Sequence, residues 1–383
     1  IVLCSATQPC LEQTAHPTAE NIKDIVPFDE ELWRVFRRTQ IIDKGGMRLD
    51  AIPAFIAEQL NRTDSLLVIC NLKKQTAYLF TEIKLENTVI FHLSAGMCMT
   101  HRMAVISEIN SALERKRKNS DAPKVVCIST QVIEAGVDVS FGCVIRLCAG
   151  LDSVIHAAGR CNRNGELNGA ADVFIINCRG EDLGMLRSIK DGKMACMSLL
   201  SDYEYHPEKY PSGLTSDEAV YAYYKKLYIQ SDIGAQDMPI KIDGSPFTLF
   251  DLLSLDRTFA NAPYLKANGE KYALTQAFKT AGNRFTVFGS STTAVIVPYG
   301  EGKEIIAEFG SKRAEDDIKY LKKLIKKARA YTVSLYENQR RALADSGALH
   351  PIADGIALAL SEEFYNEDFG LNLDGESREA ITL

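Results

Sequence analysis

Residues 124–166 read KVVCISTQVIEAGVDVSFGCVIRLCAGLDSVIHAAGRCNRNGE. Val125–Ile128 is a short, apolar and largely β-branched run, which predicts a buried strand. Cys143–Ala149 is a second apolar run and predicts another. The loop between them contains Gly136, which permits close approach of the backbone to a ligand, and Asp138 follows two residues later. We therefore expect two strands of one parallel sheet, with a ligand-facing loop between them.

A helix is predicted after the second strand. Asp152 or Ser153 is suited to cap its start, and Gly165 is suited to end it. Three polar residues at i, i+4 and i+7 would share one face: His156, Arg160 and Arg163. Planar guanidinium groups match the oxygens of a phosphate, so this helix and the neighbouring loop predict an anion site.

The two parts of this stretch resemble motifs V and VI of superfamily 2 helicases, which lie on the second of two RecA-like lobes. The spelling STQVIEAGVDVSF, followed by AGRCNRNGE, is similar to the CRISPR-associated helicase–nuclease of type I interference systems. A lone GRxxR would be a weak signal, whereas both motifs in order with a strand between them are specific. The competing interpretation is a generic α/β domain with surface arginines.

Length and composition suit a protein of two domains. The chain has 383 residues, 46% hydrophobic and 25% charged, with a formal net charge of -6. Nucleic-acid binding would therefore depend on local basic patches. The ten cysteines form no paired CxxC sets, and no signal peptide or membrane span is evident, so we expect reduced thiols and a cytoplasmic protein.

The resemblance implies three regions. Residues 1–19 would end a first RecA-like lobe, because Ile1–Thr7 (IVLCSAT) reads as an apolar strand that resembles helicase motif III; Ser5 and Thr7 are the positions that couple the nucleotide site to nucleic acid. Residues 20–180 would form the second lobe, a RecA-like doubly wound parallel sheet. Residues 181–383 would form a linker helix and a smaller mixed α+β accessory domain. A start at Ile1, without Met, predicts a fragment of a longer protein.

Four residues are predicted to contact nucleic acid in the second lobe. Asn71 follows the apolar strand Leu66–Cys70 at a position like motif IV, and Thr130 would contact the backbone of the tracking strand. His101 and Arg102 match a histidine–arginine segment of the family. For this last pair, a capped helix start with a salt-bridging arginine is an equally good interpretation.

The resemblance also assigns the nucleotide site. Arg160 and Arg163 would be arginine fingers for an ATP held with Mg²⁺ mostly by the first lobe. Asp138 would hold the ribose, the Gly136 backbone would approach the γ-phosphate region, and Glu134 would orient the loop. His156 stands where the family more often has Gln. The sequence has no GxxxxGK[ST] phosphate loop, so this chain alone is expected to be inactive as an ATPase. It also has no His-Asp dipeptide of the kind that the family's nuclease domain carries.

The later part of the chain is less distinctive. We expect a helix over 247–255, a hairpin from 284–289 and 293–298, and a cationic helix over 316–331. The lysines of that helix favour a solvated face, with contact to a DNA backbone as the alternative. The hairpin, VIVPYGEGKEII and YNEDFGLNL resemble the family's accessory domain, which is thought to cap the DNA channel and help dock the crRNA-guided surveillance complex.

These observations predict part of an ATP-dependent translocase on single-stranded DNA that serves type I CRISPR interference together with that surveillance complex. Two other interpretations stay open. One is another superfamily 2 motor, such as a restriction translocase. The other is a non-catalytic module that binds DNA or the surveillance complex.

Overall fold

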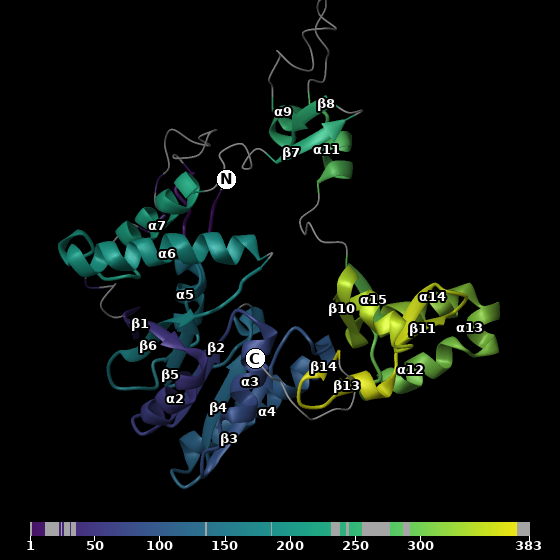
Figure 1. Ribbon diagram of the computed structural model, residues 1–383, viewed down its shortest axis with the longest axis horizontal. Coiled ribbons are helices and arrows are strands. Elements are labelled where there is room, and N and C mark those ends of the chain that lie inside the picture. The colour runs from purple at the N-terminus through teal and green to yellow at the C-terminus, as the bar shows by residue number, and fades with distance from the viewer. Residues whose placement is uncertain are drawn as a thin grey trace, which may run out of the picture.

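The computed structural model describes most of the chain (Figure 1). The described residues are 2–11, 23, 25, 26, 31, 36–134, 136–184, 186–230, 238–242, 245–254, 276–285 and 292–373. Most of residues 12–35, and residues 286–291 of the predicted hairpin, lie outside them.

A six-stranded parallel sheet forms the centre of the lobe before residue 180. Its strands lie in the order β1-β6-β5-β2-β4-β3. They are β1 (Thr39–Arg48), β2 (Ser65–Ile69), β3 (Thr88–Leu93), β4 (Lys124–Ser129), β5 (Cys143–Leu147) and β6 (Ala171–Arg179). Every neighbouring pair is parallel, and the central strands are apolar along nearly their whole length because both faces of the sheet are covered. The predicted doubly wound α/β class is confirmed.

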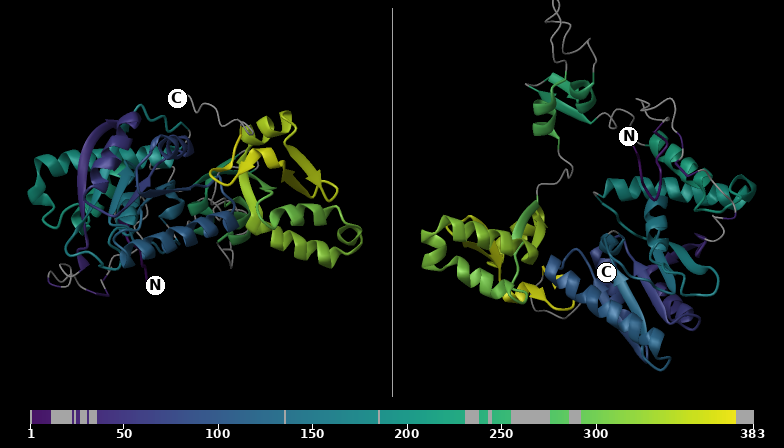
Figure 2. Two further views of the ribbon diagram at one scale, coloured as in Figure 1. Left: turned by 90° about the horizontal axis from the view of Figure 1, so that it is seen from below. Right: turned by 180° about the vertical axis from the view of Figure 1, so that it is seen from behind.

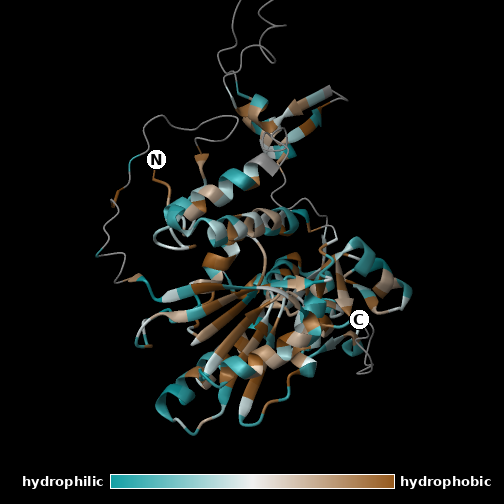
Figure 3. Cartoon of the chain, turned by 60° about the vertical axis from the view of Figure 1, so that its left-hand side comes forward, coloured by the Kyte–Doolittle hydropathy of each residue, from teal (hydrophilic) through white to brown (hydrophobic). Residues whose placement is uncertain are grey.

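Helices cover the sheet on both sides. One face is covered by α2 (Ile52–Leu60) and α3 (Lys73–Glu82), and the other by α4 (Met99–Lys118) and α5 (Leu151–Ala158). Along β2, Leu66 and Val68 pack toward the first pair, whereas Leu67 and Ile69 pack toward the second. Figure 3 shows these apolar strands between helices of mixed polarity. Loops at the carboxyl ends of such strands form the usual ligand-facing edge.

Two strand predictions were wrong. The sequence placed no strand in residues 39–48, yet β1 pairs with β6 at the edge of the sheet. Edge strands have a partner on one side only and tolerate polar residues, and β1 is interrupted by an irregularity between Asp43 and Gly46. Conversely, the described residues 2–10 contain no strand, and no described strand lies beside them to provide hydrogen bonds.

The helix α5 is shorter than predicted. It ends at Ala158, with Gly159 after it, so Arg160 and Arg163 lie in the turn beyond the helix. The chain leaves the helix because Cys161 forms a bridge with Phe141, and Asn162 N donates to Phe141 O. Neither Asp152 nor Ser153 caps the start, since Gly150 occupies the N-cap position.

Two long helices follow the sheet. They are α6 (Arg187–Tyr205) and α7 (Asp217–Gln230). They pack on α5 through a third apolar cluster that includes Val154, Leu199 and Val220. The described part of residues 238–285 forms a small separate cluster. It contains β7 (Pro239–Ile242), β8 (Ser245–Thr248), α9 (Leu249–Leu253) and α11 (Phe278–Arg284), so the predicted helix over 247–255 begins two residues late, after a strand.

The last described region is a mixed α+β unit, in line with the predicted fold. Its four-stranded sheet has the order β10-β9-β12-β11. The elements are β9 (Thr292–Ile296), α12 (Gly302–Phe309), α13 (Lys312–Asp316), α14 (Ile318–Ala328), β10 (Thr332–Tyr336), α15 (Glu337–Asp345), β11 (Leu349–Ile352), β12 (Ala357–Leu360), β13 (Tyr365–Asn366) and β14 (Gly370–Leu371). β9 pairs with β10 and β12; the other predicted hairpin strand, 284–289, begins at the last residue of α11.

This accessory unit contacts the first sheet's lobe beside α4, as both views of Figure 2 indicate. Thr100 Oγ1 donates to Ala330 O at 3.1 Å. The short hairpin β13–β14 lies against the carboxyl ends of the strands, where Leu371 N donates to Gly96 O at 2.8 Å. The hairpin therefore closes one side of the edge at which functional loops are expected.

Candidate functional site

The loop after β4 is the centre of the candidate site. It begins at Thr130, makes one turn of 3-10 helix over Gln131–Ile133, and continues through Glu134 to Asp138. Gly136 has φ +72°, and a Cβ placed there would meet nothing within 4 Å. The exposed backbone at Gly136 thus leaves space on its outer side, as an approaching anion requires.

Arg160 is almost completely buried and holds this loop by its backbone. Its Nε donates to Ile133 O at 3.0 Å, and its Nη2 donates to Glu134 O at 2.5 Å. Burial, reinforced by the nearby positive charge of Arg163, lowers the pKa of the Arg160 guanidinium. In this state Arg160 is bonded within the protein, so contact with a phosphate would require it to exchange these carbonyl oxygens.

Arg163 is more available. Its side chain is 41% exposed, and its Nε pairs with Asp138 Oδ1 at 2.9 Å. Ser140 Oγ accepts from Arg163 N at 3.0 Å and so fixes the start of the side chain. A cavity of about 370 Å³ adjoins Arg163 and is also lined by Phe36, Arg38 and Gly159. The structure therefore brings together Arg163, Asp138 and the end of the predicted phosphate-facing loop.

His156 lies on the exposed side of α5, one turn before the arginines. Ser5 and Thr7 lie in the N-terminal segment, which packs on α7. Ser5 Oγ donates to Thr7 O at 2.9 Å, and Thr7 Oγ1 is 3.1 Å from Tyr224 OH. Neither of these bonds reaches the loop, so the predicted coupling of Ser5 and Thr7 to it stays a prediction.

Thr130 and Arg102 carry the two buried polar atoms that have no hydrogen-bond partner among the described residues, namely Thr130 Oγ1 and Arg102 Nε. Thr130 N donates to Leu93 O, which places Thr130 at the carboxyl end of the sheet. Arg102 lies in the first turn of α4, which starts from the same edge. An unpaired hydroxyl at a strand end is suited to accept or donate to a ligand that reaches this edge.

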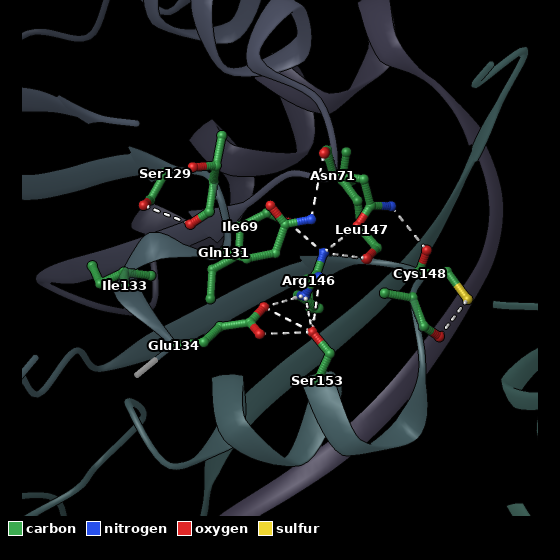
Figure 4. Close-up of polar contacts among 12 residues, drawn as sticks. Ile69, Asn71, Ser129, Gln131, Ile133, Glu134, Arg146, Leu147, Cys148 and Ser153 are labelled. Atoms are coloured by element: carbon green, nitrogen blue, oxygen red, sulfur yellow. Dashed lines mark hydrogen bonds and ion pairs between the residues drawn. The ribbon is translucent and has the colours of Figure 1, made fainter. Parts of the chain in front are cut away.

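Asn71 was predicted to meet nucleic acid, but its side chain is buried and bonded within the protein. Its Nδ2 donates to Cys148 O at 3.0 Å and to Glu181 Oε1 at 2.9 Å, and its Oδ1 accepts from Arg146 Nη1 at 2.7 Å. Contact with DNA would require these bonds to break. The buried set around Arg146 is drawn in Figure 4.

His101 is likewise buried and joins the lobe to the accessory unit. Its Nδ1 lies 2.9 Å from Tyr365 OH, its Nε2 lies 3.0 Å from Glu367 O, and its ring stacks on Tyr299 with centroids 4.2 Å apart. Burial lowers the pKa of His101. Neither interpretation of the sequence predicted this contact between the lobe and the accessory unit, because the partners of His101 lie far away in the chain.

Sequence reasoning also missed Arg146, which is 1% exposed in β5 and pairs with Glu134 Oε1 at 2.9 Å. The signal was present: a single arginine within the apolar run Cys143–Ala149 must have a buried partner. Nothing in the run indicated that the partner is Glu134, since that contact depends on the loop geometry.

A second cavity and the lysines of α14 lie away from the candidate site. A larger cavity of about 470 Å³ occupies the opposite, amino edge of the sheet and contains none of the predicted site residues; Arg62, Lys116 and Lys124 line it. The lysines of α14 cover one side of that helix, and Lys327 pairs with Glu301 at 3.1 Å. The described residues contain no cluster of three metal-ligating side chains and no helix long and apolar enough to cross a membrane.

Comparisons with known proteins agree with this fold. Residues 62–166 match the family described as CRISPR-associated nuclease/helicase Cas3, C-terminal. Over 41 residues the chain is 63% identical to the CRISPR-associated nuclease/helicase Cas3 of Haloferax volcanii, which is 11% of this chain and 4% of that protein. The ATP complex of T. fusca Cas3 has a similar fold, with a TM-score of 0.50 and 12% identity over 84% of this chain and 39% of that one.

A further solved CRISPR-associated protein gives a TM-score of 0.49 at 12% identity, over 88% of this chain and 41% of that one. The chain thus spans well under half the length of the relatives that it matches. The matched family region contains β2, β3, β4, β5 and the two arginines of the candidate site. Over residues 62–166 the chain is therefore similar to the C-terminal part of the CRISPR-associated nuclease/helicase Cas3.

Proposed function

We propose that this chain supplies the second motor lobe and the accessory unit of an ATP-dependent translocase on single-stranded DNA that acts in type I CRISPR interference. One observation carries the proposal. A single loop has the unpartnered Thr130 hydroxyl at one end and Asp138, paired with Arg163, at the other. A loop so built can face nucleic acid and a nucleotide at once.

The residues present fit part of an ATP site. Arg163 offers a partly exposed guanidinium, and the open backbone at Gly136 leaves room for an anionic group beside it. ATP, when bound, would supply the phosphoryl group whose hydrolysis drives translocation. Within this chain, Arg163 would neutralise negative charge, with Arg160 as a second arginine finger. Asp138 would exchange its pairing with Arg163 for the ribose, and His156 would lie beside the same site.

Mg²⁺ would be held mainly by the first lobe. No described cluster of this chain has the carboxylates that the ion needs. At the other end of the loop, Thr130 would contact the backbone of the DNA strand, with Arg102 beside it; Asn71 and His101 would do so only after leaving their internal partners. Opening and closing of the two lobes would then move the strand. The accessory unit would help dock the RNA-guided surveillance complex, in the cytoplasm.

The decisive experiment measures ATP hydrolysis with and without single-stranded DNA, on this chain alone and on the chain restored to its complete reading frame. We expect DNA-stimulated hydrolysis in the complete protein and none in the chain alone, because a phosphate loop is absent here. Absence of hydrolysis from both, with DNA binding retained, would contradict the proposal and favour a non-catalytic binding module. DNA-stimulated hydrolysis without any binding to the surveillance complex would favour another superfamily 2 translocase.

A further inference from the structure

Arg146 is the largest fully buried side chain among the described residues, and it is charged. All three of its nitrogens make hydrogen bonds. Nε and Nη2 meet Ser153 Oγ at 3.2 and 2.8 Å, and Nη1 meets Asn71 Oδ1 and Leu147 O, both at 2.7 Å. The ion pair with Glu134 completes the set, as Figure 4 shows.

The bonds continue past Asn71 across the edge of the sheet. Asn71 Nδ2 donates to Glu181 Oε1 at 2.9 Å, and Lys193 Nζ donates to Glu181 Oε2 at 2.6 Å. Lys193 belongs to α6, the helix that follows the lobe. An unbroken chain of buried and half-buried charged and polar groups therefore connects the loop at Glu134, through β5 and the end of β2, to α6.

Stability alone does not account for a charged residue at this position. Burial of an ion pair carries a desolvation cost that its own attraction often fails to exceed, and apolar side chains of similar volume are commonly as stable. The neighbours of Arg146 in β5 are apolar and buried. An arginine here thus indicates that a particular geometry of its partners matters.

The partner that is fixed most firmly is Glu134. Ser153 Oγ and Arg146 both bind its carboxylate, and Arg160 binds its carbonyl oxygen. In the sequence Glu134 lies midway between Thr130 and Asp138, so a residue that fixes Glu134 holds the loop at its middle. Arg146 touches neither end itself.

We propose that Arg146 is a positioning residue. Through Glu134 and Asn71 it fixes the loop to β2, β5 and α6. Binding of a ligand at Thr130 would therefore change the position of Asp138. The inference rests on the proposed function, because it assigns DNA to one end of the loop and nucleotide to the other. Its consequence is that Arg146 sets how strongly DNA stimulates ATP hydrolysis.

The test uses the complete protein and the ratio of hydrolysis rates with and without single-stranded DNA. In Arg146→Met we expect this ratio to fall about tenfold or more, since misplacement by about 1 Å is enough for such losses. Leu66→Ala is the matched control. It opens a cavity in the neighbouring strand β2 and lowers the thermal midpoint as well, but it does not touch the polar chain, so the ratio should persist.

Glu134→Gln provides the second variant, and serves alone if Arg146→Met does not fold. It keeps the shape of the side chain while removing its charge, so we expect a reduced ratio together with a lower thermal midpoint, because the buried Arg146 loses its ion pair. The comparison with Leu66→Ala, which also lowers the midpoint, separates the two effects. The double variant should lose no more than the stronger single variant, because both break one contact.

The outcomes separate the two proposals. A wild-type complete protein that DNA does not stimulate overturns the proposed function, and this inference with it. Normal stimulation in Arg146→Met, or an equal loss in Leu66→Ala, overturns the positioning role alone. Selective loss in the Arg146 and Glu134 variants supports it.

Discussion

Arg160 and Arg163 are three residues apart but differ in how firmly the protein holds them. Arg160 is buried against two carbonyl oxygens of the loop, whereas Arg163 is 41% exposed and pairs with a carboxylate that is itself exposed. An exposed pair of this kind contributes about 0–1 kcal/mol to stability. Arg163 is therefore free to exchange partners at little cost, and Arg160 is not.

The first prediction concerns Arg163→Ala in the complete protein. We expect ATP hydrolysis to fall by about 10³-fold or more, because an arginine finger typically contributes about 10³–10⁵ in rate. The thermal midpoint should stay close to that of the wild type, since only exposed contacts are lost, namely the pair with Asp138 and a hydrogen bond from Nη1 to Gly159 O at 3.1 Å. Steady-state hydrolysis and thermal unfolding check the two parts. Arg62→Ala, which removes an exposed pair with Glu58 far from the site, is the control; near-normal hydrolysis by Arg163→Ala would refute the assignment.

At this scale the sequence identified some residues and not others, for a physical reason. Arg163 and Asp138 lie on loops that we propose to face a ligand, and residue types that a ligand would set form a recognisable pattern. Arg146 and Glu181 both bond to Asn71 at the edge of the sheet, and Lys193 of α6 donates to Glu181. Such pairs can be predicted only when the order of the strands in the sheet is known, and the spacing of residues along the chain does not give that order.

Among the elements, the hairpin β13–β14 depends on a glycine. Gly370 has φ +75°, and a Cβ there would lie 2.5 Å from Gly96 O. The loop after β3 and the hairpin therefore approach each other at a distance that only glycine permits. His92 Nδ1, 2.9 Å from Asp368 O, lies beside this contact.

We expect Gly370→Ala to separate the hairpin from the lobe. The substitution combines backbone strain, which costs more than about 0.4–1 kcal/mol, with a collision against backbone that cannot move aside. Limited proteolysis near residues 361–373 and the thermal midpoint report the change. Gly355→Ala is matched in strain, since Gly355 has φ +83°, but its Cβ would meet nothing within 4 Å. Equal behaviour of the two variants would argue against a close contact at Gly370.

The elements that could be predicted were those with a local cause. The buried strands β4 and β5 are apolar apart from Lys124 and Ser129 at the ends of β4 and Arg146 within β5. The edge strand β1 lacks that signature because it has one partner and carries polar residues. The end of α5 could not be read from periodicity, since the bridge between Phe141 and Cys161 terminates the helix while the helical spacing of arginines continues.

At the scale of the whole molecule, two buried histidines join the lobe to the accessory unit. His92 bonds Thr76 Oγ1 at 3.0 Å as well as Asp368 O, and His101 lies between Tyr299 and Tyr365. Burial lowers the pKa of His92 to about 4, against an ordinary value near 6.5. The neutral ring is thus the form that the folded protein holds.

The third prediction follows from this shift. Between about pH 6.5 and 4 the unfolded chain binds more protons at this residue, so stability is complete above about pH 6.5 and declines as the pH falls. The shift corresponds to roughly 3 kcal/mol. Thermal midpoints measured from pH 7.5 to 4.5 should fall, and less steeply in His92→Gln. His350→Gln, at an exposed ring, is the control and should retain the wild-type slope; identical slopes in all three proteins would contradict the role of His92.

The long sequence distance across this joint also affects how the chain is made. His92 and Asp368 are 276 positions apart. At ribosomal speeds of about 5–20 residues per second, roughly 14 to 55 seconds separate the synthesis of the two. Throughout that interval the surface that Tyr365 and the hairpin later cover is open on a nascent lobe. That surface is consequently where a chaperone would gain most by binding during translation.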